Sequence, residues 1–162
     1  MDTLSLTDEP KRSCFGCSAC CEALIIHEIK KPAHQPCPNC STGVACDIYQ
    51  DRYNSCRGFG CFWLHGSGAE NDRPDKSGVV SFLAIKPSGI YVTMSEYRAG
   101  ALDDPGVRTQ TQELLGWDVI VTHMPIGKRL TTYVPERRVE SPWLFWSDRK
   151  GETDYVPASE YF

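Results

Sequence analysis

The chain has 162 residues, of which 23% are charged and 41% hydrophobic, and its formal net charge is −4. This composition is typical of a folded globular protein, and the acidic balance argues against a broad basic surface for nucleic acid. The apolar runs fall far short of the roughly 20 residues of a membrane span, and residues 1–10 lack the apolar stretch of a secretory signal, so we expect no membrane partner.

The first part of the chain is predicted to be a small, irregular cysteine-rich module over residues 1–66, with a polar lead-in over 1–13. A short helix is expected within 20–30, and one or two helical turns are expected within 47–54. The polar, turn-rich segment 66–78 is expected to link this module to the rest of the chain.

The second part, residues 67–162, is predicted to be a small α+β region packed on the module. Apolar alternation and turn residues predict six strands, over 79–86, 90–94, 117–123, 130–134, 143–146 and 153–156, with a turn at 86–89. The expected fold class is therefore α+β, an irregular cysteine-rich metal-binding module followed by a mainly antiparallel sheet with one helix.

That helix is expected over residues 105–115, because its ends carry the usual signals. Asp104 can supply an N-cap oxygen and Pro105 suits the first helical position. Gly116 suits the left-handed position that closes a helix.

The nine cysteines all lie between Cys14 and Cys61. Full disulfide pairing would leave one thiol over, and disulfide scaffolds are typical of secreted chains. Pairs two residues apart, such as Cys37 and Cys40, more readily present two thiolates to one metal ion in a reducing cytosol. The sequence therefore predicts a cytoplasmic metal-binding protein, with redox-active or buried free thiols as the alternative.

Three motifs make up this cysteine set. The first is Cys14-x2-Cys17-x2-Cys20-Cys21, in which three thiolates at steps of three can turn towards one centre. Adjacent Cys20 and Cys21 would be strained as ligands of one small ion, so one of them is expected to serve a second centre or to be a buried thiol. The second motif is a Cys37-Pro-Asn-Cys40 knuckle, and the third joins Cys46, Cys56 and Cys61 at irregular spacing. The predicted metal ligands are Cys14, Cys17, Cys20, Cys21, Cys37, Cys40, Cys46, Cys56 and Cys61.

The first motif, together with Cys46-x-Ile-Tyr-x2-Arg52-x3-Cys56-Arg57-x-Phe59-x-Cys61, resembles the YkgJ-type cysteine cluster family. Its CxxCxxCC domain is described as zinc- or iron-chelating, and the resemblance covers residues 14–61. The chain departs from the family at Tyr53, where the family has proline, and at the doubled Cys37 and Cys40, where one cysteine is expected and Cys40 is preferred as the ligand.

The resemblance implies metal binding. Flagellin lysine methylases carry a similar cysteine motif with an iron–sulfur cluster, which indicates that such a module can accompany catalysis. Four thiolates are usual for one zinc ion or one iron–sulfur cluster, so nine indicate two centres, or one centre with spare thiols. The irregular spacing favours an iron–sulfur cluster, with Zn²⁺ as the other cofactor. Candidates to offset the negative charge are Lys30, Lys31, Arg52 and Arg57, although the two arginines also suit a solvated surface.

The predicted function is that of a metal-binding protein with a structural, redox or regulatory role. The alternatives are an iron–sulfur-dependent enzyme related to cysteine-motif protein methylases, and a zinc-stabilised module that binds a protein partner. The sequence indicates no catalytic residue. His34 is a weaker candidate ligand because it precedes Cys37 by three residues, and His123 is expected to be a buried structural residue.

Overall fold

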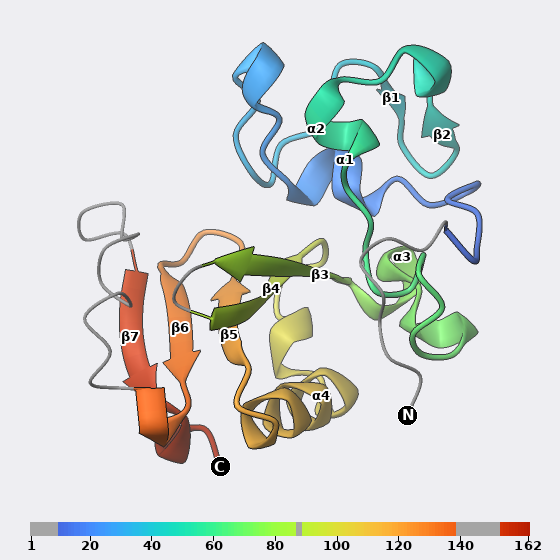
Figure 1. Cartoon of the computed structure of the whole chain (residues 1–162). Helices are drawn as coiled ribbons and strands as arrows, with labels where there is room; N and C mark the ends of the chain where they lie inside the picture. Colours follow the sequence, from blue (N-terminus) through green and yellow to red (C-terminus); the bar gives the residue numbers. More distant parts are fainter. Residues whose placement is uncertain (1–9, 87–88, 139–152) are drawn as a thin grey trace.

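The structure is a computed structural model that describes residues 10–86, 89–138 and 153–162. Its main sheet has five strands in the order β3-β4-β5-β6-β7 (Figure 1). The strands are β3 (Val79–Lys86), β4 (Gly89–Glu96), β5 (Ile120–Met124), β6 (Leu130–Val134) and β7 (Thr153–Pro157). Together with the helices they confirm the predicted α+β class.

The main sheet is mixed, which corrects the expectation of a mainly antiparallel sheet. The pairs β3/β4 and β5/β6 are antiparallel, whereas β4/β5 and β6/β7 are parallel. The helix between β4 and β5 returns the chain to the same end of the sheet, and this crossover makes that pair parallel. The strand expected over 143–146 and part of the turn expected over 86–89 lie outside the described residues.

The cysteine-rich part contains short elements only. They are the helices α1 (Ala19–Ala23) and α2 (Asn54–Arg57), the strands β1 (Cys40–Ser41) and β2 (Ala45–Cys46), and helical turns at His27–Ile29 and Tyr49–Asp51. The helix expected within 20–30 is therefore shorter, since Leu24 is already extended. Its buried contacts come from Ala19 and Ala23, which are spaced four apart and are both 0% exposed.

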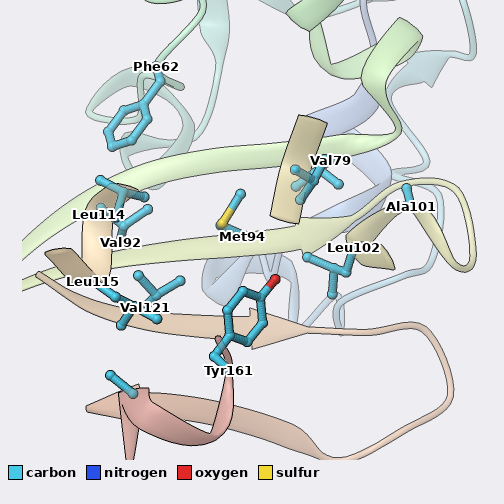
Figure 2. Packing of buried hydrophobic residues seen from close by; sticks show 12 residues of the cluster. Phe62, Val79, Val92, Met94, Ala101, Leu102, Leu114, Leu115, Val121 and Tyr161 are labelled. Atoms are coloured by element: carbon cyan, nitrogen blue, oxygen red, sulfur yellow. The ribbon is translucent and has the colours of Figure 1, made fainter. Parts of the chain in front are cut away.

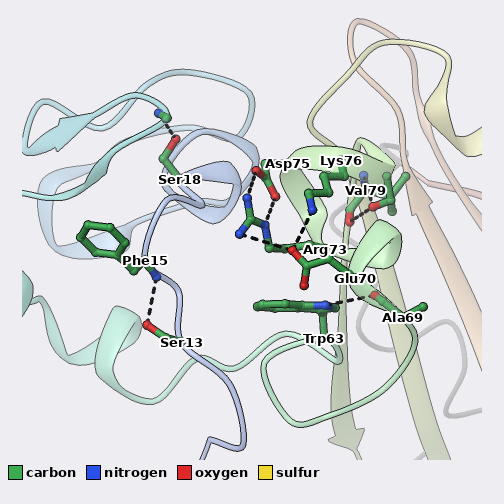
Figure 3. A network of polar contacts seen from close by, with 12 residues as sticks. Ser13, Phe15, Ser18, Trp63, Ala69, Glu70, Arg73, Asp75, Lys76 and Val79 are labelled. Atoms are coloured by element: carbon green, nitrogen blue, oxygen red, sulfur yellow. Dashed lines mark hydrogen bonds and ion pairs between the residues drawn. The ribbon is translucent and has the colours of Figure 1, made fainter.

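The expected linker over 66–78 is a folded segment. It contains a helical turn at Glu70–Asp72 and the helix α3 (Pro74–Ser77). Arg73 donates to Asp75 from Nε at 2.6 Å and lies 5.8 Å from the centroid of the Trp63 ring (Figure 3). Gly78 ends α3 at φ +81, where a Cβ would lie 2.8 Å from that of Ala101, so the position suits glycine alone.

The long helix α4 (Pro105–Gly116) confirms the helix predicted over 105–115, but its ends differ from the prediction. The Asp104 carboxylate makes no side-chain cap and instead accepts from Arg98 at 2.8 Å. The left-handed residue is Asp118, with φ 65, and not Gly116. The strand expected over 117–123 begins only at Ile120. Trp117 lies between the helix and this strand, and its side chain is 64% exposed.

The two faces of the main sheet are both covered near β3. Val79, Val92, Met94 and Val121 pack with α4 on one face, where Phe62 joins them from the cysteine-rich part (Figure 2). Val80 and Phe82, which alternate with these along β3, pack on the other face against cysteines and α1. This second face positions the candidate site. Within the described residues, no helix is long and apolar enough to cross a membrane.

His123 is buried in the main core at 6% exposure, in line with the structural role expected from the sequence. Its ring packs edge-on against Tyr133, with centroids 5.0 Å apart, and its Nε2 lies 3.1 Å from Thr111 Oγ1. Burial lowers the pKa of His123 from 6.5 to about 4, so the imidazole is neutral at pH 7.

This histidine predicts a loss of stability in acid. Between pH 6.5 and about 4 the unfolded chain binds a proton at His123 that the folded chain does not bind. The free energy of unfolding therefore falls as the pH drops through this window, by up to about 3 kcal/mol. Urea unfolding of metal-free protein at several pH values measures the loss. His123→Gln should remove that part of the pH dependence, and an unchanged dependence in the variant would contradict the assignment.

Candidate metal centre

Eight of the nine cysteines line one cavity of about 360 Å³ in the cysteine-rich part. They are Cys14, Cys17, Cys20, Cys21, Cys37, Cys46, Cys56 and Cys61. The ninth, Cys40, forms a hydrogen bond with Cys21. All nine are free thiols. The remaining wall is largely apolar and includes Leu24, Phe59 and Val80, so the thiols share a space that the main sheet closes on one side.

We define the first group as Cys14, Cys17, Cys20 and Cys61, which pack in one hydrophobic cluster with Val80. Cys14 and Cys17 sit on a tight turn, since the Cys17 N–H donates to the Cys14 carbonyl at 2.9 Å. Gly16 occupies that turn at φ +81, a conformation that favours glycine. The segment that carries Cys61 is tied to β3, because the next N–H, of Phe62, donates to the Ser81 carbonyl at 2.8 Å.

We define the second group as Cys21, Cys37, Cys40 and Cys46, which backbone bonds bring together. The Cys37 N–H donates to the Cys21 carbonyl at 3.0 Å, and the Cys40 N–H closes the knuckle on the Cys37 carbonyl at 3.2 Å. Cys40 then lies directly opposite Cys46 in the β1/β2 pair. The Cys20-Cys21 step therefore joins the two groups, one residue in each.

Cys56 belongs to neither group and lies beside the second, since Cys21 and Cys37 are among the groups that raise its pKa after burial. It lies on α2, and the preceding Ser55 is held by Glu28. The Ser55 N–H donates to Glu28 Oε1 at 2.9 Å, and its hydroxyl donates to Oε2 at 2.7 Å. Glu28 thus fixes the end of α2 that turns Cys56 towards the cavity. Sequence reasoning did not identify this role, and a serine and a glutamate far apart in the chain gave no signal for it.

Burial, together with the crowding of the thiols, raises their pKa values. Burial, followed by Cys61 and Cys17, raises the pKa of Cys14 to about 11. Burial and Cys21 raise the pKa of Cys40 to about 12. A hydrogen bond with Cys20, followed by burial, raises the pKa of Cys21. Without a cation these groups are neutral thiols at pH 7, and a bound cation would offset the repulsion between thiolates.

Backbone N–H groups that donate to the sulfurs oppose this rise in pKa. The backbone N–H groups of Ala19 and Asp75 lower the pKa of Cys17, although burial leaves it raised. Those of Leu64 and Trp63 act in the same way on Cys61. Backbone N–H groups directed at sulfur are a feature of thiolate-bound metal centres, where they stabilise the thiolates. The first group therefore offers four thiols and N–H donors of the kind that a four-thiolate centre uses, although its sulfurs are not gathered around one point.

The thiols surround a space and do not converge on a point. Among the described residues, no three His, Cys, Asp or Glu side chains form a ready group for one metal ion. The sequence preference for Cys40 over Cys37 remains a prediction, since Cys37 is 6% exposed and on the cavity wall whereas Cys40 lies behind it, next to Cys21.

Of the arginines and the histidine that the sequence suggested as further site residues, only Arg52 lines the cavity. Arg52 stacks 3.9 Å from the centroid of the Tyr49 ring and lowers the pKa of Cys14 against the effect of burial. Arg57 is exposed and donates to the Arg52 carbonyl at 2.8 Å. His34 is not among the residues that line the cavity, and its Nε2 lies 3.3 Å from Ser95 Oγ.

Comparison of the chain with protein-family models, with characterised proteins and with solved structures finds no match. The resemblance to the YkgJ-type family therefore stays a prediction from the motifs.

The raised pKa values predict that metal uptake releases protons. Thiolates are the ligands of metal ions, whereas the thiols of Cys14 and Cys40 are protonated at neutral pH. Zn²⁺ added to the metal-free protein in weak buffer should therefore release about one proton for each thiol that binds, and affinity should fall as the pH falls. A pH-indicator dye measures the release. Zinc binding without proton release would show that the thiols are not the ligands.

Proposed function

We propose that this protein binds metal through its cysteine cavity, with an iron–sulfur cluster as the favoured occupant and a structural or redox role for the centre. The single observation that carries the proposal is the convergence of eight cysteines on one cavity of about 360 Å³. Free thiols that served only as core packing would have no reason to gather around a shared space.

The breadth of the cavity supports a cluster over an isolated ion. A zinc ion draws four sulfurs to about 2.3 Å from one point. A cluster of iron and sulfide holds its four cysteines around a larger body. Eight thiols line one cavity and are enclosed by apolar side chains such as Leu24 and Val80, which suits the larger body.

Zinc is the second candidate, and the knuckle favours it. The turn between Cys37 and Cys40, with Cys46 opposite on β2, brings three thiols of the second group together through backbone bonds. A zinc ribbon uses a C-x2-C turn of this kind. A zinc ion would then stabilise the cysteine-rich part, which has little regular structure of its own. Its longest helix among the described residues, α1, has only five residues.

The composition of the centre can be measured directly. Protein purified without oxygen should show broad visible absorbance and should contain iron and sulfide in comparable amounts. A colourless protein that contains zinc would replace the iron–sulfur assignment with the zinc one. A folded protein that takes up neither zinc nor iron with sulfide would reject the proposed function.

The two cysteine groups predict two separable centres. Cys17→Ser should remove the metal of the first group, and Cys46→Ser that of the second, so each variant should retain about half of the metal of the unaltered protein. Each variant is the matched control of the other, because both exchange one half-buried thiol for a hydroxyl. Metal content by elemental analysis is the measurement. Complete loss of metal in both variants would indicate a single shared centre.

A further inference from the structure

Lys31 is a buried lysine beside the cysteines. It is 5% exposed, although lysine is almost never fully buried unless it is paired. Its main chain forms a bridge with Ile26, with N–H···O bonds of 3.0 Å in both directions, so its position in the fold is fixed. The side chain runs from this bridge back towards the end of α1.

The ammonium of Lys31 bonds to backbone carbonyls only. Nζ donates to the carbonyl oxygens of Glu22 at 3.1 Å, Leu24 at 2.5 Å and Pro32 at 2.8 Å. These bonds use all three hydrogens. Within residues 10–86, 89–138 and 153–162, no carboxylate lies within ion-pair distance of Nζ. The charge is thus hydrogen-bonded but forms no ion pair in this part of the chain, and the Glu22 carboxylate acts on it only from a greater distance.

The ammonium lies next to the backbone of the second group, because Nζ binds the carbonyl of Glu22, which follows Cys21, and the Cys21 carbonyl in turn accepts from the Cys37 N–H. Burial lowers the pKa of Lys31, and the opposing influences are, in falling order, Cys37, Cys21, Glu22 and Cys20, so the two leading ones are thiols of the second group. In turn, Lys31 opposes the raised pKa of Cys21. A buried charge without a counter-charge is costly, and the cost is offset when an anion forms next to it.

We propose that Lys31 is the fixed counter-charge of the second cysteine group and strengthens metal binding there, while the first group binds without it. This inference rests on the proposed metal-binding function. Thiolates that hold a zinc ion or an iron–sulfur cluster carry net negative charge, so a fixed cation beside them favours the occupied state. Lys31 acts through the cysteines and is a positioning residue, not a ligand.

A purely structural role for Lys31 predicts a different outcome. Its ammonium covers the terminal carbonyls of α1 at Glu22 and Leu24, which lack helical partners. A neutral amide could bond to two of the three carbonyls, whereas a thioether could bond to none. The two roles therefore separate in a pair of variants, Lys31→Gln and Lys31→Met, since both remove the charge but only the first retains donors.

The experiment measures Zn²⁺ affinity of the full chain, by competition with a chromogenic chelator, in two backgrounds. In the Cys17→Ser background, where the second group remains, Lys31→Gln and Lys31→Met should both weaken binding by about tenfold or more. In the Cys46→Ser background, where the first group remains, both should leave affinity unchanged. Lys30→Gln is the matched control, because it removes the neighbouring charge from an exposed position and should have no effect.

Three results would overturn the inference. Wild-type affinity in Lys31→Gln with weaker binding only in Lys31→Met would assign a capping role. Equal weakening in both backgrounds would assign a general loss of folding, which circular dichroism of the metal-free variants would also show. An effect of Lys30→Gln equal to that of Lys31→Gln would assign a long-range surface charge. Each of these three results would leave the proposed metal-binding function standing. If the unaltered protein bound neither zinc nor iron, the proposed function and the role of Lys31 would both be rejected.

Discussion

The constraint on which the structure depends is that β3 is covered on both faces. Alternate residues of this strand serve two clusters, with Val79 in the core under α4 and Val80 in the cluster with the first cysteine group. The bond from the Phe62 N–H to the Ser81 carbonyl then ties the cysteine-rich part to the edge of the same strand. The wall of the cavity is therefore part of the sheet, and the cysteine-rich part does not have to supply a complete core of its own.

Charge is the second constraint, because the thiols repel one another once they ionise. Two cations lie near the thiols. Arg52 stacks on Tyr49 at the half-buried wall of the cavity, and Lys31 is buried behind the second group. A centre built in these surroundings would be anionic, dry on the sheet side and held by N–H donors at Cys17 and Cys61.

The sequence predicted those elements whose signals are local. The sequence predicted almost to the residue the strands over 79–86 and 130–134 and the long helix. Their signals, apolar periodicity and the helix-starting Pro105, lie within the elements themselves. The ends of that helix were not predicted, since Asp104 pairs with Arg98, and the left-handed Asp118 pairs with Arg138 at 2.7 Å. Such contacts arise in tertiary structure. The metal site predicted from cysteine spacing stays a prediction. Neither the partition of the cysteines into two groups nor the burial of Lys31 follows from spacing.

The two cysteine groups are nested along the chain, and this order affects how they form during synthesis. The second group is complete once Cys46 has emerged from the ribosome, and its hairpin closes over a short stretch. The first group begins earlier, at Cys14, yet ends later, at Cys61. Three of its thiols, Cys14, Cys17 and Cys20, therefore wait in a growing chain while their fourth partner and the β3 wall are still being translated. During that interval they are the cysteines most open to oxidation.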